Sequence, residues 1–197
     1  MKIYYFQPAP NPAKLMFYLK EKQITDIDCV LVDLTQGEHR QPAHLQRSPR
    51  GTLPVLELDD GTCIAESLPI MEYLEELYPE PSLIGTSPRE RLRIRALERY
   101  LEMNVLLRVI RLVHATRSPL GLPPNPAIAE RENAFLPSAL AYVDSLLSGE
   151  FVAGERPSIA DCTLLAAVNF GRFGGLDITE DHPALRRWFD SYALRHV

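Results

Sequence analysis

The stretch SPRGTLPVLELDDGTCIAES, residues 48–67, decides the fold of this chain. Two short apolar runs flank Asp60 and Gly61. An Asp-Gly pair between such runs predicts a hairpin, because a tight turn needs residues that tolerate positive φ. Pro54 lies at the start of the first run, where its missing N–H removes no ladder hydrogen bond. Glu66 and Ser67 then lead into apolar residues at helical spacing. The stretch therefore predicts a proline, a hairpin and a helix start, and the unpaired amides of a helix start bind carboxylates well.

The residues before this stretch alternate between strand-like and helix-like patterns. The expected elements are a strand over 2–6, a helix over 14–22, a strand over 27–34 and a short helix over 42–46. Asn11 is followed by Pro12 and is predicted to cap the first helix, because asparagine is a favoured N-cap and proline a favoured first helical residue. Together with the hairpin, this alternation predicts a small mixed sheet covered by helices.

The residues after the hairpin change in character at a run of prolines. The segment 79–88 is predicted to end a helix and form a linker. Beyond it the apolar spacing predicts helices over 89–114, 127–147, 158–170 and 184–194. Pro137 lies inside the second of these, where it could kink the helix. Ser158 and Asp161 have the spacing of a capping box, so we expect them to matter for folding rather than for catalysis.

The composition excludes several classes of function. The net charge of −5 argues against nucleic-acid binding, which needs concentrated Lys and Arg. The three cysteines and five histidines show no metal-ligand spacing, so no metal cofactor is expected, and widely separated cysteines fit a reducing compartment. No apolar run is long enough to span a bilayer, and Met1 and Lys2 lead straight into a strand rather than a signal peptide. The expected location is the cytoplasm, with no membrane or nucleic-acid partner.

The ordered set of Leu53-Pro54, the Asp-Gly hairpin and Glu66-Ser67 resembles the glutathione-binding site of the glutathione S-transferase family. The Ser158–Asp161 segment is similar to the entry of a buried helix in the same family, so the resemblance covers both halves of the chain. It implies a thioredoxin-like domain over 1–79, a linker over 80–87 and an all-helical domain over 88–197. It also implies a homodimer packed through the helix after the hairpin and the long helix.

The resemblance implies how glutathione is held. Pro54 would be cis, leaving the N–H and C=O of Leu53 free to pair with the backbone of the cysteine in glutathione. Glu66 would meet the ammonium of the γ-glutamyl group, and Ser67 with the helix amides would hold its carboxylate. The alternative is that these residues form only an ordinary hairpin and helix cap and do not bind glutathione.

A loop before the hairpin supplies two candidates for the glycyl carboxylate of glutathione. Gly37-Glu38-His39 resembles the loop that brings a histidine to this group in several insect and bacterial classes, and Arg50 is the second candidate. For His39 taken alone, a solvated loop residue is the alternative.

The residue that activates the glutathione thiol is the point where the chain departs from the family. The family places a Tyr, Ser or Cys just after the first strand. The two possible alignments put Phe6 or Ala9 there, and neither side chain can donate a hydrogen bond or act as a nucleophile. The segment instead resembles the bacterial nu-class, in which an Asn at the Asn11 position accompanies a Thr, here replaced by Ala9. Asn11 could donate its amide to the thiolate or spend its oxygen on the helix cap.

An electrophile site is expected between the segment 8–11 and the inner face of the long helix. Its candidate residues are Ala9, Asn104, Arg108, Arg111 and Leu112. If the two arginines face inward they favour an anionic or polar co-substrate; a charged outer face is the alternative. Arg131 stands where the nu-class carries an arginine and could reach the mouth of the site, although arginines on helices are usually solvated.

These observations lead to one main functional hypothesis and three alternatives. The main hypothesis is an enzyme of detoxification that binds glutathione as co-substrate and transfers it to a small-molecule electrophile. The nu-class resemblance offers a glutathione-dependent disulfide-bond reductase. The absence of a Tyr, Ser or Cys at Phe6 and Ala9 favours a glutathione-binding module without catalysis. The last alternative is a purely structural domain with an inactive pocket.

Overall fold

Strand β1 (Lys2–Tyr5) lies inside a four-stranded sheet with the order β2-β1-β3-β4. It pairs in parallel with β2 (Asp28–Leu31) and antiparallel with β3 (Val55–Glu57), which pairs in turn with β4 (Cys63–Ala65). In this register Ile3 lies opposite both Cys29 and Leu56. The result is the mixed sheet of a thioredoxin-like domain, so the predicted fold of the first half is confirmed.

The structure is a computed structural model that describes residues 1–196, and it divides into two compact units. The first unit is Met1–Ser82 and the second begins at Leu83. Val197, the last residue of the predicted helical domain, lies outside the described residues. None of the helices within 1–196 is long and apolar enough to cross a membrane, and no group of three or more His, Cys, Asp or Glu there could hold a metal ion.

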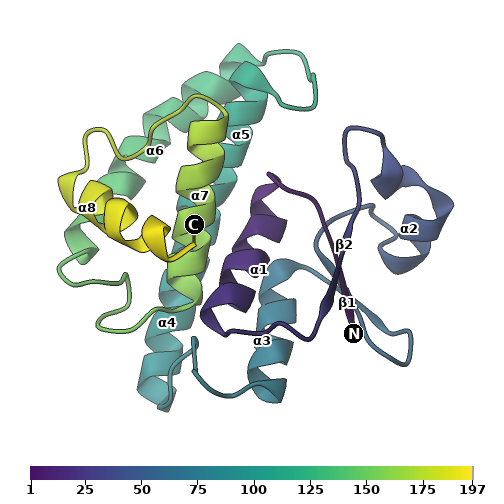
Figure 1. Cartoon of the computed structure of the whole chain (residues 1–197). Coiled ribbons are helices and arrows are strands. Elements are labelled where there is room, and N and C mark those ends of the chain that lie inside the picture. The colour runs from purple at the N-terminus through teal and green to yellow at the C-terminus, as the bar shows by residue number, and fades with distance from the viewer. Residues whose placement is uncertain (197) are drawn as a thin grey trace. The chain divides into compact units, whose positions relative to one another are not determined.

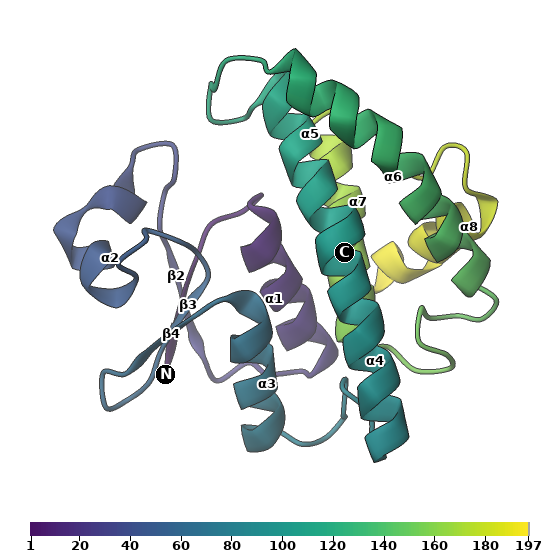
Figure 2. The same ribbon diagram turned by 180° about the vertical axis from the view of Figure 1, so that it is seen from behind.

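Helices cover both sides of the sheet in the first unit. Figures 1 and 2 show α1 (Pro10–Glu21) and α3 (Ser67–Leu77) side by side on one side, and α2 (Pro42–Arg47) beyond the other. A buried polar network joins α1 to α3, because the Tyr18 hydroxyl and the Lys22 ammonium each lie 3.1 Å from Oε1 of Glu75. Helices α1 and α3 are therefore joined to each other by polar contacts as well as by apolar packing.

The first helix begins earlier than the sequence predicts, and its cap differs. The N-cap residue is Ala9, whose side chain makes no capping hydrogen bond, and Asn11 is the second residue of α1. The prediction that Asn11 caps the helix is wrong. Pro10 takes the first helical position, where its fixed φ and missing N–H are both tolerated, and this moves the start ahead of Asn11.

Strand β2 is shorter than the predicted span 27–34. One further ladder bond runs from the Val32 N–H to the Tyr5 carbonyl at 2.8 Å. At Asp33 the chain turns, because Oδ1 of this side chain accepts from the N–H of Thr35 at 2.7 Å and of Gln36 at 3.3 Å. The short 3₁₀ helix η1 (Glu38–Arg40) follows this turn and leads to α2.

The second unit is helical, as predicted. Helix α4 (Pro88–Leu101) runs through a π-helical turn (Glu102–Leu106) into α5 (Leu107–Arg117), so the single helix expected over 89–114 is interrupted and ends later. The remaining elements are α6 (Pro126–Leu146), α7 (Ile159–Phe173), α8 (Pro183–Tyr192) and a 3₁₀ turn (Ala193–His196). Pro137 lies within α6 without ending it.

Helix α7 forms the core of this unit, since most of its residues are buried. Its start is the predicted capping box of Ser158 and Asp161. Asp161 is fully buried and accepts from the Val152 N–H at 2.9 Å, the Ser158 N–H at 2.9 Å, the Ser158 hydroxyl at 2.8 Å and the Trp188 indole at 3.1 Å. One carboxylate thus joins the preceding loop, α7 and α8.

Candidate functional site

The loop into β3 places an unpaired backbone at the centre of the predicted glutathione site. The Leu53–Pro54 peptide bond is cis, as the resemblance implied. Pairing of β3 with β1 begins at Val55, which lies opposite Tyr4. Among residues 1–196, no hydrogen bond uses the N–H or C=O of Leu53. Both groups are free to pair with an extended peptide.

Ser67 lies at the first position of α3 and is almost fully buried, with 5% of its surface exposed. No side chain caps the amides of this helix start. Glu66, which precedes it, has φ 77°, a left-handed conformation that is uncommon for a residue with a side chain. A helix start that combines a serine hydroxyl with uncapped amides can accept a carboxylate.

Arg50 and Glu66, predicted to bind different groups of glutathione, form an ion pair with each other. Their side chains are 70% and 57% exposed, so the pair is solvated and its net contribution to stability is small, about 0–1 kcal/mol. A ligand that carries both a carboxylate and an ammonium could exchange this contact for contacts with itself. The ion pair therefore holds the two side chains near each other, but it is weak enough for a ligand to replace it.

His39 lies in η1, held against the hairpin loop by a close backbone approach. Gly51 has φ 65°, and a Cβ there would stand 2.8 Å from the His39 carbonyl oxygen, so only glycine fits. Nδ1 of His39 is buried and has no hydrogen-bond partner within 1–196. Burial, together with the positive charge of Arg40 and the neighbouring His44, holds the pKa of His39 below its usual value, so the ring is neutral at neutral pH. A neutral ring can still donate one hydrogen bond to a carboxylate.

Asn11 lies inside α1, so its side chain does not cap the helix. Its side-chain oxygen is buried and has no hydrogen-bond partner among the described residues. The neighbouring positions are Pro10 and Pro12, which have no N–H, and the Ala13 N–H is bonded to the Ala9 carbonyl at 3.0 Å. In the first turn of α1, Asn11 therefore carries both the backbone donor and the side-chain amide.

The predicted electrophile residues belong to different units. Ala9 lies in the first unit, and the other four lie in the second. Asn104 lies in the π turn and donates its side-chain amide to the Tyr100 carbonyl at 3.1 Å. Leu112 is buried and lines a cavity of about 210 Å³ together with Thr116 and Asn133.

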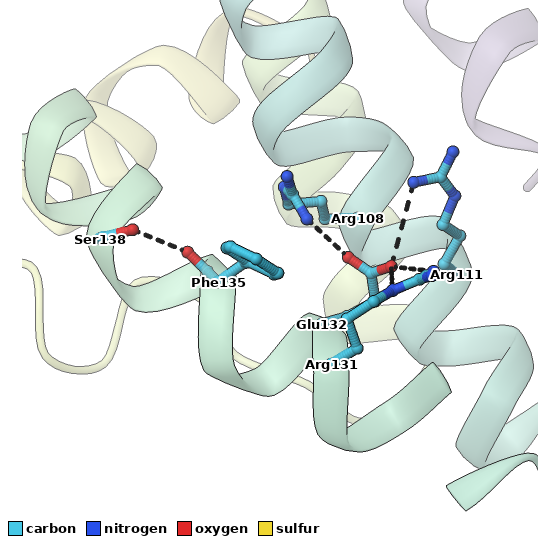
Figure 3. Close-up of polar contacts among 6 residues, drawn as sticks. All are labelled: Arg108, Arg111, Arg131, Glu132, Phe135 and Ser138. Atoms are coloured by element: carbon cyan, nitrogen blue, oxygen red, sulfur yellow. Dashed lines mark hydrogen bonds and ion pairs between the residues drawn. The ribbon is translucent and has the colours of Figure 1, made fainter. Parts of the chain in front are cut away.

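Arg108 and Arg111 of this set meet at a residue that the sequence analysis missed. Figure 3 shows both arginines reaching from α5 toward the carboxylate of Glu132 on α6, which Arg131 also contacts. We call Arg108, Arg111 and Arg131 the arginine cluster. A signal for Glu132 was present, since it continues the buried stripe of α6 through Leu136, Ala139, Leu140 and Val143. A charge on an apolar stripe requires a partner.

Glu132 is fully buried and ionised. Burial raises the pKa of this carboxyl, but hydrogen bonds from Arg131 and Arg108 and their positive charges lower it more, so it lies below its usual value. The side chain of Glu132 has no exposed surface, whereas those of Arg111 and Arg131 are 49% and 55% exposed. The arginine cluster thus has a buried anion beneath it and solvent in front of it.

Comparisons with known proteins identify a family for both units of the chain. Residues 4–82 match the family described as "Glutathione S-transferase, N-terminal domain", and residues 112–195 match "Glutathione S-transferase, C-terminal domain". Glutathione S-transferase 2 of Saccharomyces cerevisiae is 34% identical over 96% of this chain and 84% of its own length. Maleylacetoacetate isomerase of Pseudomonas aeruginosa is 30% identical over 95% of this chain and 94% of its own.

A solved structure extends this similarity to the whole backbone. The crystal structure of a glutathione S-transferase domain-containing protein from Marinobacter aquaeolei superposes with a TM-score of 0.90 at 37% identity. The match covers 99% of this chain and 98% of that one. These matches do not test the nu-class resemblance, which stays a prediction.

Proposed function

Because this chain belongs to the glutathione S-transferase family, we propose that it is an enzyme that binds glutathione in its first unit and transfers it to an electrophile. A glutathione-dependent function follows from the family, whereas the reaction is our proposal. The observation that carries the proposal is the unpaired backbone of Leu53 in the same unit as the uncapped start of α3.

Each part of glutathione has a proposed partner. The Leu53 N–H and C=O pair with its cysteine backbone next to Pro54, and Ser67 with the α3 amides holds the γ-glutamyl carboxylate. Glu66 takes the ammonium. His39 and Arg50 take the glycyl carboxylate, since one is a neutral donor and the other a cation. On binding, the exposed contact between Arg50 and Glu66 is replaced by contacts with the two charged ends of the ligand.

Asn11 is the proposed catalytic residue. The thiol of free glutathione must lose its proton near neutral pH, against a usual thiol pKa of about 8.5. Hydrogen bonds to the thiolate lower that pKa because they stabilise the charged form. The side chains of Phe6 and Ala9 have no hydrogen-bond donor, the Ala9 N–H is bonded to the Phe6 carbonyl, and the prolines on either side of Asn11 have no N–H. We therefore assign thiolate stabilisation to the backbone N–H and side-chain amide of Asn11.

Reduction of a disulfide by glutathione is a second candidate, favoured by the missing Tyr, Ser or Cys at Phe6 and Ala9. In that reaction the bound thiolate attacks sulfur, and the rate depends on the leaving thiol as well as on the attacking one. A binding module without turnover is the third. Isomerisation belongs in the same set of assays, because the 30% identical relative is named maleylacetoacetate isomerase.

Calorimetry with glutathione tests the binding site. We expect Ser67→Ala to weaken binding about tenfold or more, because a buried hydrogen bond to a charged group contributes about 1.5–3 kcal/mol. Ser145→Ala is the matched control, since Ser145 is exposed and bonds only the local Tyr142 carbonyl. Equal affinity of the wild type and both variants would remove the proposed site.

Turnover then separates the reactions. The substrates are an aryl halide, a small mixed disulfide and maleylacetoacetate, each with glutathione in excess. Conjugation of the aryl halide supports the main proposal, and faster turnover of the disulfide supports the second candidate. Binding without any turnover supports the module.

Four further predictions stay open. The electrophile-site assignment of Ala9, Asn104, Arg108, Arg111 and Leu112 stays a prediction, as do a cytoplasmic location and a role in detoxification. The predicted homodimer is tested by light scattering, where a species of only 22.3 kDa at working concentration would contradict it.

A further inference from the structure

We propose that the arginine cluster on α5 and α6 is a binding site for a small organic carboxylate, with Glu132 as the residue that positions it. Arg108 and Arg111 also belong to the proposed electrophile site, so the inference names a class of ligand for that site and rests on the proposed function in this respect. It starts from the contacts drawn in Figure 3.

Glu132 holds the arginines by separate contacts on its two oxygens. Oε2 accepts from Nη1 of Arg108 at 2.9 Å, and Oε1 accepts from Nη2 and Nε of Arg131 at 2.7 and 3.1 Å. Nη1 of Arg111 lies 3.9 Å from Oε1, an ion pair without a hydrogen bond. Three flexible side chains are therefore gathered around one immobile anion, which reduces the conformational entropy that a ligand must remove.

The charges of this group do not cancel. The arginine cluster carries three positive charges, Glu132 carries one negative charge, and none of the three arginines has another carboxylate partner among residues 1–196. One arginine is enough to neutralise the charge of Glu132. If the arginine cluster served only to stabilise the fold, the other two arginines would have no function. Two surplus cations held close together attract an anion.

The unused donors face solvent and suit a planar oxyanion. Arg111 makes no hydrogen bond within the described chain, so all five of its N–H groups are available, and about half of its side chain is exposed. A guanidinium fork matches the geometry of a carboxylate and can bind it through two parallel hydrogen bonds.

An exposed aromatic ring narrows the class of ligand. The Arg108 guanidinium carbon lies 4.8 Å from the centre of the Phe135 ring, and Phe135 is 53% exposed. This ring offers an apolar surface beside the cations. A carboxylate attached to an aromatic or aliphatic body therefore fits better than an inorganic ion, because its body can cover Phe135 while its head meets Arg111.

Calorimetry with benzoate, in buffer without glutathione, tests the site. We expect benzoate to bind, and benzyl alcohol, which has a similar ring without the charge, not to bind measurably. Inorganic phosphate is the comparison that distinguishes an organic carboxylate from any oxyanion, and we expect it to bind more weakly because it does not cover Phe135. Binding of benzyl alcohol as tight as that of benzoate would show an apolar pocket and overturn the proposal.

Variants at Arg111 locate the binding. Arg111→Gln should weaken benzoate binding about tenfold or more, because a charge-assisted contact is lost. Arg111→Lys should recover only part of the affinity, since lysine keeps the charge without the fork. Arg93→Gln is the matched control, an exposed arginine of α4 that should leave the affinity unchanged.

The fold must be shown to survive the change. Arg111 makes no hydrogen bond to the described residues, so Arg111→Gln should unfold at nearly the wild-type temperature. A folded Arg111→Gln variant with wild-type affinity for benzoate overturns the proposal, as does a wild type that binds no benzoate at low salt.

Discussion

Replacing Asp161 by alanine should destabilise the second unit more than any other single change that we consider. The side chain is fully buried and is the common acceptor for the N–H groups of Val152 and Ser158, the Ser158 hydroxyl and the indole of Trp188. Alanine removes the acceptor and leaves these donors in place. The hydroxyl can rotate to another partner, but the two backbone N–H groups and the indole cannot.

The magnitude follows from the number of stranded donors. A buried donor without an acceptor costs about 1–3 kcal/mol, so three of them cost about 3–9 kcal/mol, and entry of a water molecule into the new space brings the value toward the lower end. We expect a loss of about 4 kcal/mol. That is a large part of the roughly 5–15 kcal/mol by which domains are usually stable.

Asp161→Asn should show an intermediate loss. Asparagine keeps one oxygen for Val152 and Trp188, but it places an NH₂ group against the N–H of Ser158, so two donors face each other. Asp190→Ala is the matched control, because Asp190 lies exposed on α8. It should change the stability by less than about 0.5 kcal/mol, as most surface substitutions do.

Urea unfolding followed by far-ultraviolet circular dichroism measures these losses. Trp188 is the single tryptophan of the chain, so its fluorescence reports on the same contact independently. If Asp161→Ala lies within about 1 kcal/mol of the wild type, the four contacts contribute little and the reasoning fails.

The pH dependence gives a second check on Asp161. Burial raises the pKa of this carboxyl to about 6, in spite of the donors around it that lower the pKa. A raised pKa in the folded state means that the stability contributed by this group is largest below the unfolded pKa of 3.8 and declines as the pH rises to about 6. The difference in stability between wild type and Asp161→Asn should therefore shrink between pH 4 and pH 7. A difference that grows over this range would contradict the sign.

Further predictions concern Asn11 and Ala9 in the first unit and the loss of folding stability at low pH. Asn11→Ala should lower glutathione turnover about tenfold or more, because a hydrogen bond to a charged thiolate is lost; full activity at unchanged glutathione affinity would show that its backbone N–H alone suffices. Ala9→Ser should raise the unfolding free energy by about 0.5–1 kcal/mol, measured in urea, because a serine at the N-cap of α1 can accept from the Asn11 N–H. Burial raises the pKa of Asp177, but hydrogen bonds from Thr179 and the charges of two arginines lower it more, to about 2. The ionised carboxylate therefore stabilises the folded state above pH 3.8, and this contribution is lost as the pH falls toward 2. Acid titration of Asp177→Asn against the wild type should show the difference vanish over that range.

Short segments with strong local preferences were predictable from the sequence. The Asp-Gly hairpin, the helix that begins at Ser67 and the capping box of Ser158 and Asp161 all lie where expected. Each of these depends on residues within a few positions of one another, so the physical cause is present in the local sequence. The cis Leu53–Pro54 bond was predicted as well, but from the family resemblance rather than from the local residues.

Element ends that depend on competing local signals were predicted less well. Two prolines and an asparagine compete for the start of α1, and the earlier proline determines it, so Asn11 moves from the cap into the helix. Strand β2 ends early because Asp33 captures the following amides, a contact that apolar alternation does not reveal. The sequence contained both alternatives, and only the folded backbone shows which hydrogen bonds form.

Pairings between distant residues were decided by tertiary structure alone. Arg50 and Glu66 are separated along the chain, as are Arg108 and Glu132, yet each pair makes direct contact. Helical spacing shows that Glu132 lies on the buried stripe of α6, but which cations neutralise it depends on how α5 packs against α6. The sequence by itself determines where charge must be compensated, and the packing of the helices decides which residues compensate it, because an ion pair acts over a few ångströms of space and is independent of distance along the chain.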